Sequence, residues 1–568
     1  MSEQEVGQPV GAEAEAIYQR LYAELGIADS MDLSRYASVL DMAVESFGRF
    51  AARPAFSSLG HSISYADLDR LTRQFACWVQ HCTDLQPGDR IAIQMPNLVQ
   101  YPVVALGALR AGLVIVNTNP LYSEREIEHQ FNDAGVKALV VLANVARNVA
   151  RVLPRTGVKY SIVTELADLH PPLKRLVINK VARYVKKMVP AFDIPGALSL
   201  NGALRQGAGH TLQPLAPQAG DLAVLQYTGG TTGVAKGAML SHGNLVANAL
   251  QVDAMIKTHV LGDDAPVMVQ PLPVYHIYAF MTCLYSMLNG FHVVLVPNPR
   301  DLATVVQALR DYRPQVFCGL NTLFMGLCNN EDFRKLDFSR LRLTLSGGMA
   351  LTTAAAQRWQ EVTGCPVSEG YGLTETSPVV SINPGNRIVI GTIGIPVTAT
   401  RVKVVDGEGA ALPVGEPGEL CVQGPQVMQG YWQRPDDTAS LMDAQGYFRT
   451  GDIAVIRADG YLQIVDRKKD MIVVSGFNVY PNELEDVLYE HPDVLECAAV
   501  GVPDPTSGEV IKMFVVSKSG QLGAEEVREF CRRSLTAYKV PKLVEFRREL
   551  PKTNVGKILR RELRDEQN

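Results

Sequence analysis

The sequence predicts a multidomain α/β protein: a large N-terminal domain of α/β sheets, a small β-barrel-like subdomain and a small α+β C-terminal domain. Its 568 residues exceed one ordinary core, since domains hold roughly 150 residues each. Short apolar runs alternate with helix-length stretches through the first two thirds, and turn signals become dense afterwards. Such runs, rich in β-branched residues, are typical of buried parallel strands.

The N-terminal α/β part is expected over residues 41–391, after an N-terminal extension at 1–40. Its apolar runs occupy 90–95, 113–117, 138–143, 292–296 and 342–348. The uncharged segment 271–299 could be mistaken for a membrane span, but Pro273, Asn289 and Gly290 interrupt it. We therefore predict a buried helix, a glycine break and a buried strand at 291–296.

Two further units follow along the chain. The turn signals DGEG, PVGEPGE and ADGY separate alternating strands at 401–406 and 419–424, which predicts an antiparallel β subdomain over 392–466. Residues 467–568 mix predicted strands with predicted helices at 483–490 and 524–534, so we expect a separate α+β domain there.

Composition narrows the class of protein. Hydrophobic residues make up 47% and charged residues 20%, which is ordinary for a globular protein. A net charge of −5 lacks the basic excess of nucleic-acid binders, so we expect no nucleic-acid partner. The nine cysteines are scattered without a CxxC pair, and the N-terminus has no apolar signal segment. We expect free thiols and a cytoplasmic location.

Residues 171–190 carry six basic and no acidic side chains, with apolar residues recurring at helical spacing. One interpretation is a helix that lies peripherally on the anionic inner membrane. The other is a solvated helix whose apolar stripe packs on the protein, and we prefer this second interpretation.

The strongest local motif is YTGGTTGVAKG, which follows an apolar strand. Its members are Thr228, Gly229, Gly230, Thr231, Thr232, Gly233 and Lys236. Glycines let backbone N–H groups turn toward an anion, hydroxyls add donors, and the lysine adds positive charge. The motif therefore predicts a phosphate-binding loop, although its spacing is not that of Walker A.

This loop resembles the phosphate loop of the adenylate-forming superfamily, which includes acyl-CoA synthetases, peptide-synthetase adenylation domains and luciferases. Segments 368–376, 447–472 and 551–564 are similar to three further motifs of that superfamily, in the expected order. The resemblance covers the chain from about residue 40 and is nearest to bacterial long-chain fatty-acid–CoA ligases. Several motifs in order make a chance match improbable.

The resemblance implies an ATP-dependent ligase that uses Mg²⁺ and releases AMP and diphosphate. The carboxylate of the acid and the α-phosphate of ATP are both negatively charged, so cations and hydrogen-bond donors must screen their repulsion and hold them in line. It assigns catalysis to Lys557, Glu375 and Thr228, with the last two also at Mg²⁺. It assigns nucleotide contacts to the loop from Thr228 to Lys236 and to Gly347, Glu369, Gly370, Tyr371, Gly372, Thr374, Asp452 and Arg467. Tyr371 would stack on adenine, and the Asp452 carboxylate would accept hydrogen bonds from both ribose hydroxyls.

Segment 271–280 resembles the part of the family that lines the acid pocket. It has no aspartate to pair with a substrate amine, so an apolar acyl chain fits better than an amino acid. The expected acyl-binding residues are Tyr275, His276, Phe280, Leu320, Gly347 and Gly348, with Phe280 as an aromatic gate. A core role and a substrate-side role for His276 are equally favoured. The expected acid is a long-chain fatty acid, for degradation or lipid synthesis.

The second half-reaction, thiol attack on the adenylate, implies a domain movement about a hinge at Lys469. The loop of Ser475, Gly476 and Phe477 would then help to form the pantetheine tunnel. The chain ends soon after Lys557, so we expect no fused carrier domain and CoA as acceptor. A homodimer stays open.

Four alternatives remain: a medium-chain or aryl acid–CoA ligase, a ligase that loads a carrier protein, a non-enzymatic binding protein of this fold, and an unrelated ATPase or kinase. The last would release ADP rather than AMP.

Overall fold

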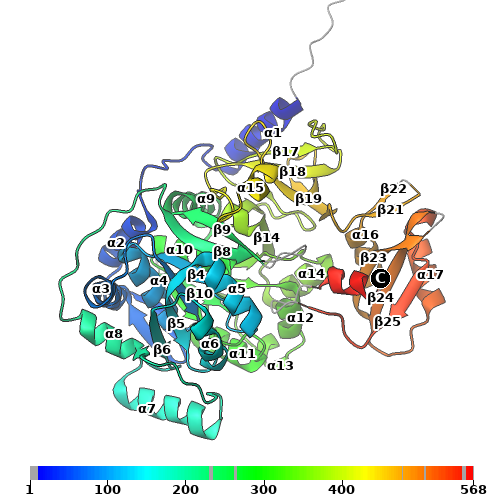
Figure 1. Cartoon of the computed structure of the whole chain (residues 1–568). Coiled ribbons are helices and arrows are strands. Elements are labelled where there is room, and N and C mark those ends of the chain that lie inside the picture. Colours follow the sequence, from blue (N-terminus) through cyan, green and yellow to red (C-terminus); the bar gives the residue numbers. More distant parts are fainter. Residues whose placement is uncertain are drawn as a thin grey trace, which may run out of the picture.

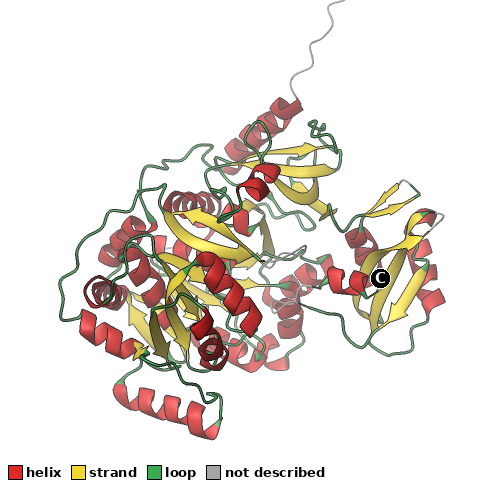
Figure 2. Cartoon of the chain, in the orientation of Figure 1, coloured by secondary structure: helices red, strands yellow, loops and turns green. Residues whose placement is uncertain are grey.

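The computed structural model describes residues 10–228, 235–260, 265–475, 477–504, 507–552 and 558–566 (Figure 1). Two large sheets with surrounding helices form the body of the molecule, and a smaller antiparallel sheet adjoins it (Figure 2). A separate α+β unit ends the chain. The α/β fold class predicted from the sequence is confirmed.

A seven-stranded sheet has the order β7-β6-β5-β3-β4-β8-β9. Its strands are β3 (Arg90–Gln94), β4 (Val114–Asn117), β5 (Val136–Leu142), β6 (Tyr160–Thr164), β7 (Leu198–Ser199), β8 (Leu222–Thr228) and β9 (Lys236–Ser241). All pairs are parallel except β8 with β9. The predicted buried strands at 90–95, 113–117 and 138–143 are therefore confirmed.

A nine-stranded sheet has the order β16-β15-β14-β13-β12-β10-β11-β1-β2. Its strands are β1 (Pro54–Ser58), β2 (His61–Ser64), β10 (Val267–Gln270), β11 (His292–Leu295), β12 (Val316–Gly319), β13 (Leu343–Ser346), β14 (Val367–Gly372), β15 (Val379–Ile382) and β16 (Ile395–Pro396). The central pairs are parallel, and β2, β15 and β16 pair antiparallel at the edges. Pairing of β16 ties residues past 391 to this large sheet.

One hydrophobic core joins the two sheets through α2 (Val39–Arg49), α3 (Tyr65–Cys82), α4 (Gln100–Arg110), α9 (His242–Val260) and α10 (Ile277–Leu288). The other face of the seven-stranded sheet packs on α5 (Glu124–Ala134) and α6 (Ala146–Val152). The other face of the nine-stranded sheet packs on α11 (Leu302–Tyr312), α12 (Asn321–Cys328), α13 (Glu331–Arg334) and α14 (Thr353–Thr363). Sheets covered on both faces explain the continuous apolar strands.

Local sequence sets where several helices begin and end. Capping boxes at Ser64 with Asp67 and at Ser123 with Glu126 satisfy the free N–H groups that open α3 and α5. Helix α5 ends at Gly135, whose φ of 62° suits glycine. These signals are visible in the sequence as S-x-x-[DE] before an apolar run.

The uncharged segment 271–299 folds as predicted, with the buried α10, a turn at Gly290 (φ 66°) and the buried β11. Among the residues that the structure describes, no helix is both long enough and apolar enough to cross a bilayer.

The β subdomain is an antiparallel sheet of β17 (Arg401–Val405), β18 (Gly418–Gln423), β19 (Phe448–Ile456) and β20 (Leu462–Arg467). Where we expected a β-barrel-like unit, the structure has this open four-stranded sheet. Helix α1 (Val10–Leu25) lies beside it, and the Tyr22 hydroxyl donates to the Pro396 carbonyl at 2.9 Å (Figure 1). Helix α15 (Pro435–Leu441) precedes β19.

The C-terminal unit has a sheet of order β22-β21-β24-β23, with β25 parallel to β24. Its strands are β21 (Ile472–Val474), β22 (Phe477–Val479), β23 (Val494–Asp504), β24 (Gly508–Ser517) and β25 (Leu543–Phe546). Its helices are α16 (Pro481–Tyr489), α17 (Ala524–Arg532) and α18 (Arg560–Asp565). Separate small cores support the predicted α+β character.

The basic segment contradicts our preferred interpretation. Residues 171–190 form α7 (Pro172–Lys180) and a π-helical turn (Val181–Val185) at the edge of the body (Figure 1). No residue of α7 is buried, and Leu173 and Val185 are 75% and 73% exposed. The apolar stripe therefore does not pack on the protein, because the segment extends outward and is held by an ion pair from Arg183 to Glu165.

Candidate active site

A cavity of about 1410 Å³ lies where the body, the β subdomain and the C-terminal unit meet. Its walls come from the ends of β8, β13 and β14, from α10, from β19 and β20, and from α18 with the two residues before it. Parallel strands β13 and β14 open at their carboxyl ends, where α/β sheets commonly bind ligands.

Most of the predicted site residues within the described ranges share this cavity. Its lining includes Thr228, Lys236, His276, Leu320, Gly347, Gly348, Gly370, Tyr371, Gly372, Thr374, Glu375, Arg467 and Lys469. Residues Gly229, Gly230, Thr231, Thr232, Gly233, Gly476 and Lys557 lie outside the described residues. Strand register places Thr228 opposite Lys236, so the two ends of the phosphate loop sit together at the cavity.

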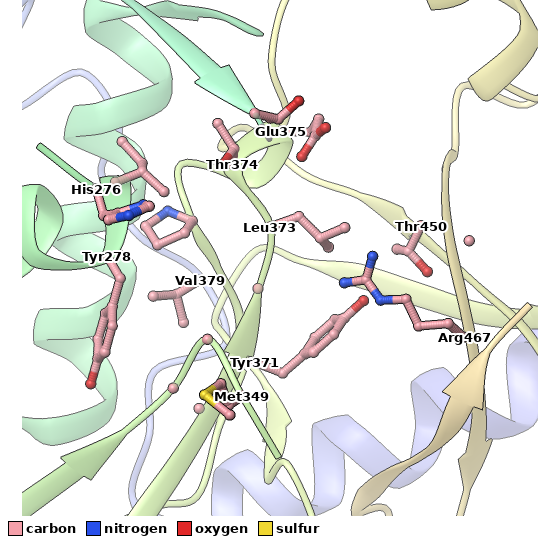
Figure 3. A pocket seen from close by; sticks show the side chains of 18 of the residues that line it. His276, Tyr278, Met349, Tyr371, Leu373, Thr374, Glu375, Val379, Thr450 and Arg467 are labelled. Atoms are coloured by element: carbon pink, nitrogen blue, oxygen red, sulfur yellow. The ribbon is translucent and has the colours of Figure 1, made fainter. Parts of the chain in front are cut away.

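At one end of the cavity, the Asp452 carboxylate is buried and engaged on both oxygens. The Tyr371 hydroxyl donates to Oδ2 at 2.5 Å, and Arg467 Nε approaches Oδ1 at 2.9 Å. Register explains the ion pair, since Asp452 on β19 faces Arg467 on β20. Figure 3 shows the Tyr371 hydroxyl close to the Arg467 guanidinium. Ribose hydroxyls would therefore have to share or replace donors that Asp452 already has.

Burial and the neighbouring Asp452 raise the pKa of Tyr371 well above its usual value. The phenol therefore stays protonated and acts as the donor in this hydrogen bond. Asp452 itself is absent from the cavity wall, and its side chain is only 3% exposed. It acts on the cavity through Tyr371 and Arg467, which do line it.

Glu375 lies in the short 3₁₀ helix η3 (Thr374–Thr376), and its Oε1 accepts a hydrogen bond from the Tyr431 hydroxyl at 2.5 Å. Nearby, Lys236 Nζ pairs with Asp437 Oδ2 at 2.9 Å and lies 5.4 Å from the centre of the Tyr431 ring. Tyr431 and Asp437 also line the cavity, and the sequence analysis missed both. They lie in a Gln/Tyr/Trp/Pro stretch with none of the Gly/Thr pattern that signalled the phosphate loop.

The donor set suits Mg²⁺ held together with a triphosphate. Glu375 supplies one hard carboxylate and Thr228 one hydroxyl at the same cavity. Within the described ranges, no three His, Cys, Asp or Glu side chains gather as a metal site. Mg²⁺ ordinarily binds through one or two carboxylates plus phosphate oxygens and water, so this sparse set fits it.

Glu369 does not reach the cavity, contrary to the expected nucleotide contact. Its Oε1 accepts from the Leu351 backbone N–H at 2.9 Å, and burial raises the pKa of its carboxyl to about 8. Its backbone carbonyl accepts from the Asn383 N–H at 2.9 Å. Alternation along β14 would place Glu369 on the same face as Tyr371, so its hydrogen bond to Leu351, and not strand alternation, accounts for its position outside the cavity wall.

The opposite end of the cavity is largely apolar. Its walls include Leu272, Tyr278, Met281, Tyr285, Leu345 and Ile382. His276 faces the cavity at the start of α10, and no described residue hydrogen-bonds its ring. Enclosure by the protein lowers the pKa of His276 to about 4, so the imidazole is neutral at physiological pH. Of its two equally favoured roles, this placement supports the substrate-side one.

Two expected acyl contacts are not in the wall. Phe280 is buried and meets Tyr101 edge-on at 6.4 Å between ring centres, and Tyr275 is buried beside Gln226, which donates to its carbonyl. Helical spacing explains Phe280, since Tyr278, Met281 and Tyr285 share the cavity face of α10 and position 280 points away. Phe280 therefore does not line the cavity in this structure, and its role as an aromatic gate stays a prediction.

The expected hinge lies at the cavity, and the expected CoA loop does not. Lys469 lines the cavity, and burial lowers the pKa of its ammonium. Ser475 has a φ of 51° and donates its N–H to the Ser507 carbonyl at 2.7 Å. Phe477 is exposed on the C-terminal unit and stacks on Tyr538 with 4.9 Å between ring centres.

Comparisons with known proteins find matches to both the N-terminal part and the C-terminal unit of this chain. Residues 44–432 match the AMP-binding enzyme family, and residues 483–557 match the AMP-binding enzyme C-terminal domain. A long-chain-fatty-acid–CoA ligase of Escherichia coli O6:H1 is 50% identical over 94% of this chain and 95% of that protein. One of Haemophilus influenzae is 47% identical over 94% and 96%. ATP-bound MatB from Rhodopseudomonas palustris has a TM-score of 0.80 at 28% identity, covering 93% of this chain and 98% of MatB.

Proposed function

The chain belongs to the AMP-binding enzyme family, and from this premise we propose that it is a long-chain-fatty-acid–CoA ligase. The enzyme is an AMP-forming acid–thiol ligase with ATP and CoA as substrates. The observation that carries the long-chain assignment is the cavity itself. One end gathers charged side chains near Thr228 and Lys236, and among the described residues the wall at the other end has no charged side chain that could bind an amine.

In the first half-reaction, the acid's carboxylate oxygen attacks the α-phosphorus, and the bond to the bridging oxygen breaks to release diphosphate. Lys236 and Thr228 stand at the phosphates, and Thr374 stands at the α-phosphate. Lys557 is proposed to bridge the two reacting anions. Mg²⁺, held by Glu375 and Thr228, would neutralise phosphate charge. Tyr371 offers a ring for adenine, and Asp452 orients Tyr371 and Arg467 at the ribose edge.

In the second half-reaction, the CoA sulfur attacks the acyl carbonyl carbon, and the bond to AMP breaks. The C-terminal unit meets the body through residues near Lys469, which we propose as the hinge. Its loop at Ser475 and Phe477 lies outside the cavity wall, so we propose that a rotation brings it to the thiol.

An acid-panel assay tests this function. Saturated acids of increasing length, aryl acids and amino acids are offered with ATP, and AMP release is measured with and without CoA. We expect long-chain acids to dominate and CoA to raise AMP release. Release of ADP, or equal activity with amino acids, would refute the proposal.

We also propose that α7 and the turn after it hold the enzyme peripherally on an anionic membrane. Supporting this, the exposed apolar side chains are Leu173, Leu176, Val177, Tyr184, Val185 and Met188, interspersed with basic residues. A basic amphipathic helix binds such a surface through apolar burial and charge. A membrane-held enzyme would meet its substrate where long-chain acids partition.

Co-sedimentation with vesicles tests the membrane contact. Leu173→Ser with Leu176→Ser should weaken binding to phosphatidylglycerol vesicles without changing the melting temperature, since neither side chain is buried. Leu121→Ser, at another exposed leucine, is the matched control. Equal binding by all three proteins would contradict the contact. That the protein forms a homodimer stays a prediction, and a measurement of its molecular mass in solution tests it.

A further inference from the structure

The segment that follows β18 lies along β9, the strand that leaves the phosphate loop. The Met239 N–H donates to the Gly430 carbonyl at 2.9 Å, and the Gln429 N–H donates to the Met239 carbonyl at 3.0 Å. The Trp432 N–H donates to the Gly237 carbonyl at 2.8 Å. Residues 429–432 are thus hydrogen-bonded to the strand that begins at Lys236, and they cannot shift without it.

The same segment also holds Glu375 in two places. The Met428 N–H donates to the Glu375 carbonyl at 2.8 Å, and the Tyr431 hydroxyl donates to Glu375 Oε1 at 2.5 Å. Hydrogen bonds from residues 428 and 431 therefore hold both the backbone and the side chain of Glu375. Among the described residues, none hydrogen-bonds to the second carboxylate oxygen, Oε2, which is therefore available to a ligand in the cavity that Glu375 lines.

The direction of the hydrogen bond follows from the two groups that form it. Tyr431 is 8% exposed, and its hydroxyl supplies the hydrogen, because a carboxylate oxygen can only accept. The phenol is the donor and the carboxylate the acceptor. Its ring also faces Lys236 Nζ at 5.4 Å from the ring centre, a distance at which aromatic rings attract cations.

We propose that Tyr431 is a positioning residue of the phosphate site, which fixes the Glu375 carboxylate for Mg²⁺–ATP and supports the Lys236 ammonium. The inference rests on the proposed function. The hydrogen bond from Tyr431 to Oε1 already restricts the orientation of the Glu375 carboxylate. The carboxylate therefore loses less conformational freedom when Oε2 contacts a cation, and this pre-organisation favours cation binding.

The test measures ATP binding by calorimetry with no acid and no CoA present, with and without Mg²⁺. Tyr431→Phe removes only the hydroxyl. We expect ATP affinity in the presence of Mg²⁺ to fall roughly five-fold, which corresponds to the free energy of ordering one side chain on binding. Affinity without Mg²⁺ should stay within about two-fold, because the ring remains beside Lys236. Tyr447→Phe, in the same subdomain but outside the cavity lining, is the control and should match the parent.

A double-mutant cycle guards against a general loss of structure. Glu375→Gln weakens Mg²⁺-dependent affinity by itself, and adding Tyr431→Phe to it should cause no further loss if the hydroxyl acts through Glu375. Additive losses, equal weakening with and without Mg²⁺, or no change in Tyr431→Phe would each overturn the inference. Because no acid is present, these results are independent of the acid panel, which alone decides the proposed function.

Discussion

The two ends of the cavity differ in whether their polar groups already have protein partners. At the nucleotide end, Asp452 is paired with Arg467, Lys236 with Asp437, and Glu375 accepts from Tyr431. At the acyl end, the described structure shows no hydrogen-bond partner for the hydroxyls of Tyr278, Tyr285 and Ser346. Figure 3 shows Tyr278 on α10 and His276 just before that helix, across the cavity from Arg467.

This difference follows from what each end must bind. Charged groups that face a cavity need partners when no ligand is present, so ATP exchanges existing pairs for new ones. An acyl chain needs no exchange, since it gains about 25 cal/mol for each Å² of apolar surface removed from water. The nucleotide end therefore selects by charge and the acyl end by shape.

The largest effect tests the nucleotide end. Lys557→Ala should slow adenylate formation by about 10²- to 10³-fold, because a cation between two reacting anions is lost. Thioester formation from supplied acyl-AMP should continue at nearly the parent rate. Diphosphate exchange and acyl-CoA formation measure the two steps. Equal loss of both would refute the assignment of this lysine to the first step.

A change at the acyl end should be felt mainly there. A Cβ added at Gly347 would lie 3.2 Å from the Gly370 carbonyl oxygen and 3.4 Å from Tyr278 Cζ. Gly347→Val should therefore lower kcat/KM for a long-chain acid by roughly 10- to 100-fold, the usual range for overpacking. Because Gly347 is also expected to contact the nucleotide, the KM for ATP in the same assay should rise, but by a smaller factor. An equal effect on both substrates would mean that the two ends are not separable.

Glu369 is buried outside the cavity wall, and its titration predicts a stability effect. Its carboxyl pKa is raised from 4.5 to about 8, so the folded state holds the proton more tightly than the unfolded state. Its contribution is complete below about pH 4.5 and is lost as pH rises toward 8, by up to about 1.4 kcal/mol per pH unit. Urea unfolding at pH 6 and pH 8 should show a smaller decline for Glu369→Gln than for the parent. Parallel declines would argue against a protonated Glu369.

The smallest effect concerns the pair that ATP must separate. Asp437→Asn removes the partner of Lys236, whose side chain is 39% exposed. A pair this exposed contributes about 0 to 1 kcal/mol, so ATP should bind up to roughly five-fold more tightly. Calorimetric titration with Mg²⁺–ATP measures the gain, and Asp436→Asn is the neighbouring control. Weaker binding would indicate that Asp437 itself contacts the nucleotide.

Much of the fold could be predicted because it depends on local pattern. Apolar runs identified the parallel strands, and Gly290 separated α10 from β11. Motifs with fixed spacing placed Thr228, Tyr371 and Glu375 at one cavity. Neither pattern nor motif identified Tyr431, since its partner Glu375 lies 56 positions earlier and the hydrogen bond exists only when β9 meets residues 429–432.

By itself the sequence determined the order of strands and helices, the class of chemistry and the absence of an amine partner in segment 271–280. Those features depend on residue type and spacing along the chain. Only the tertiary structure decided that Glu369 stays out of the cavity wall, that Phe280 packs on Tyr101 in the core and that the apolar stripe of α7 is exposed. Each of these depends on which distant surface covers a side chain, and periodicity alone cannot identify that surface.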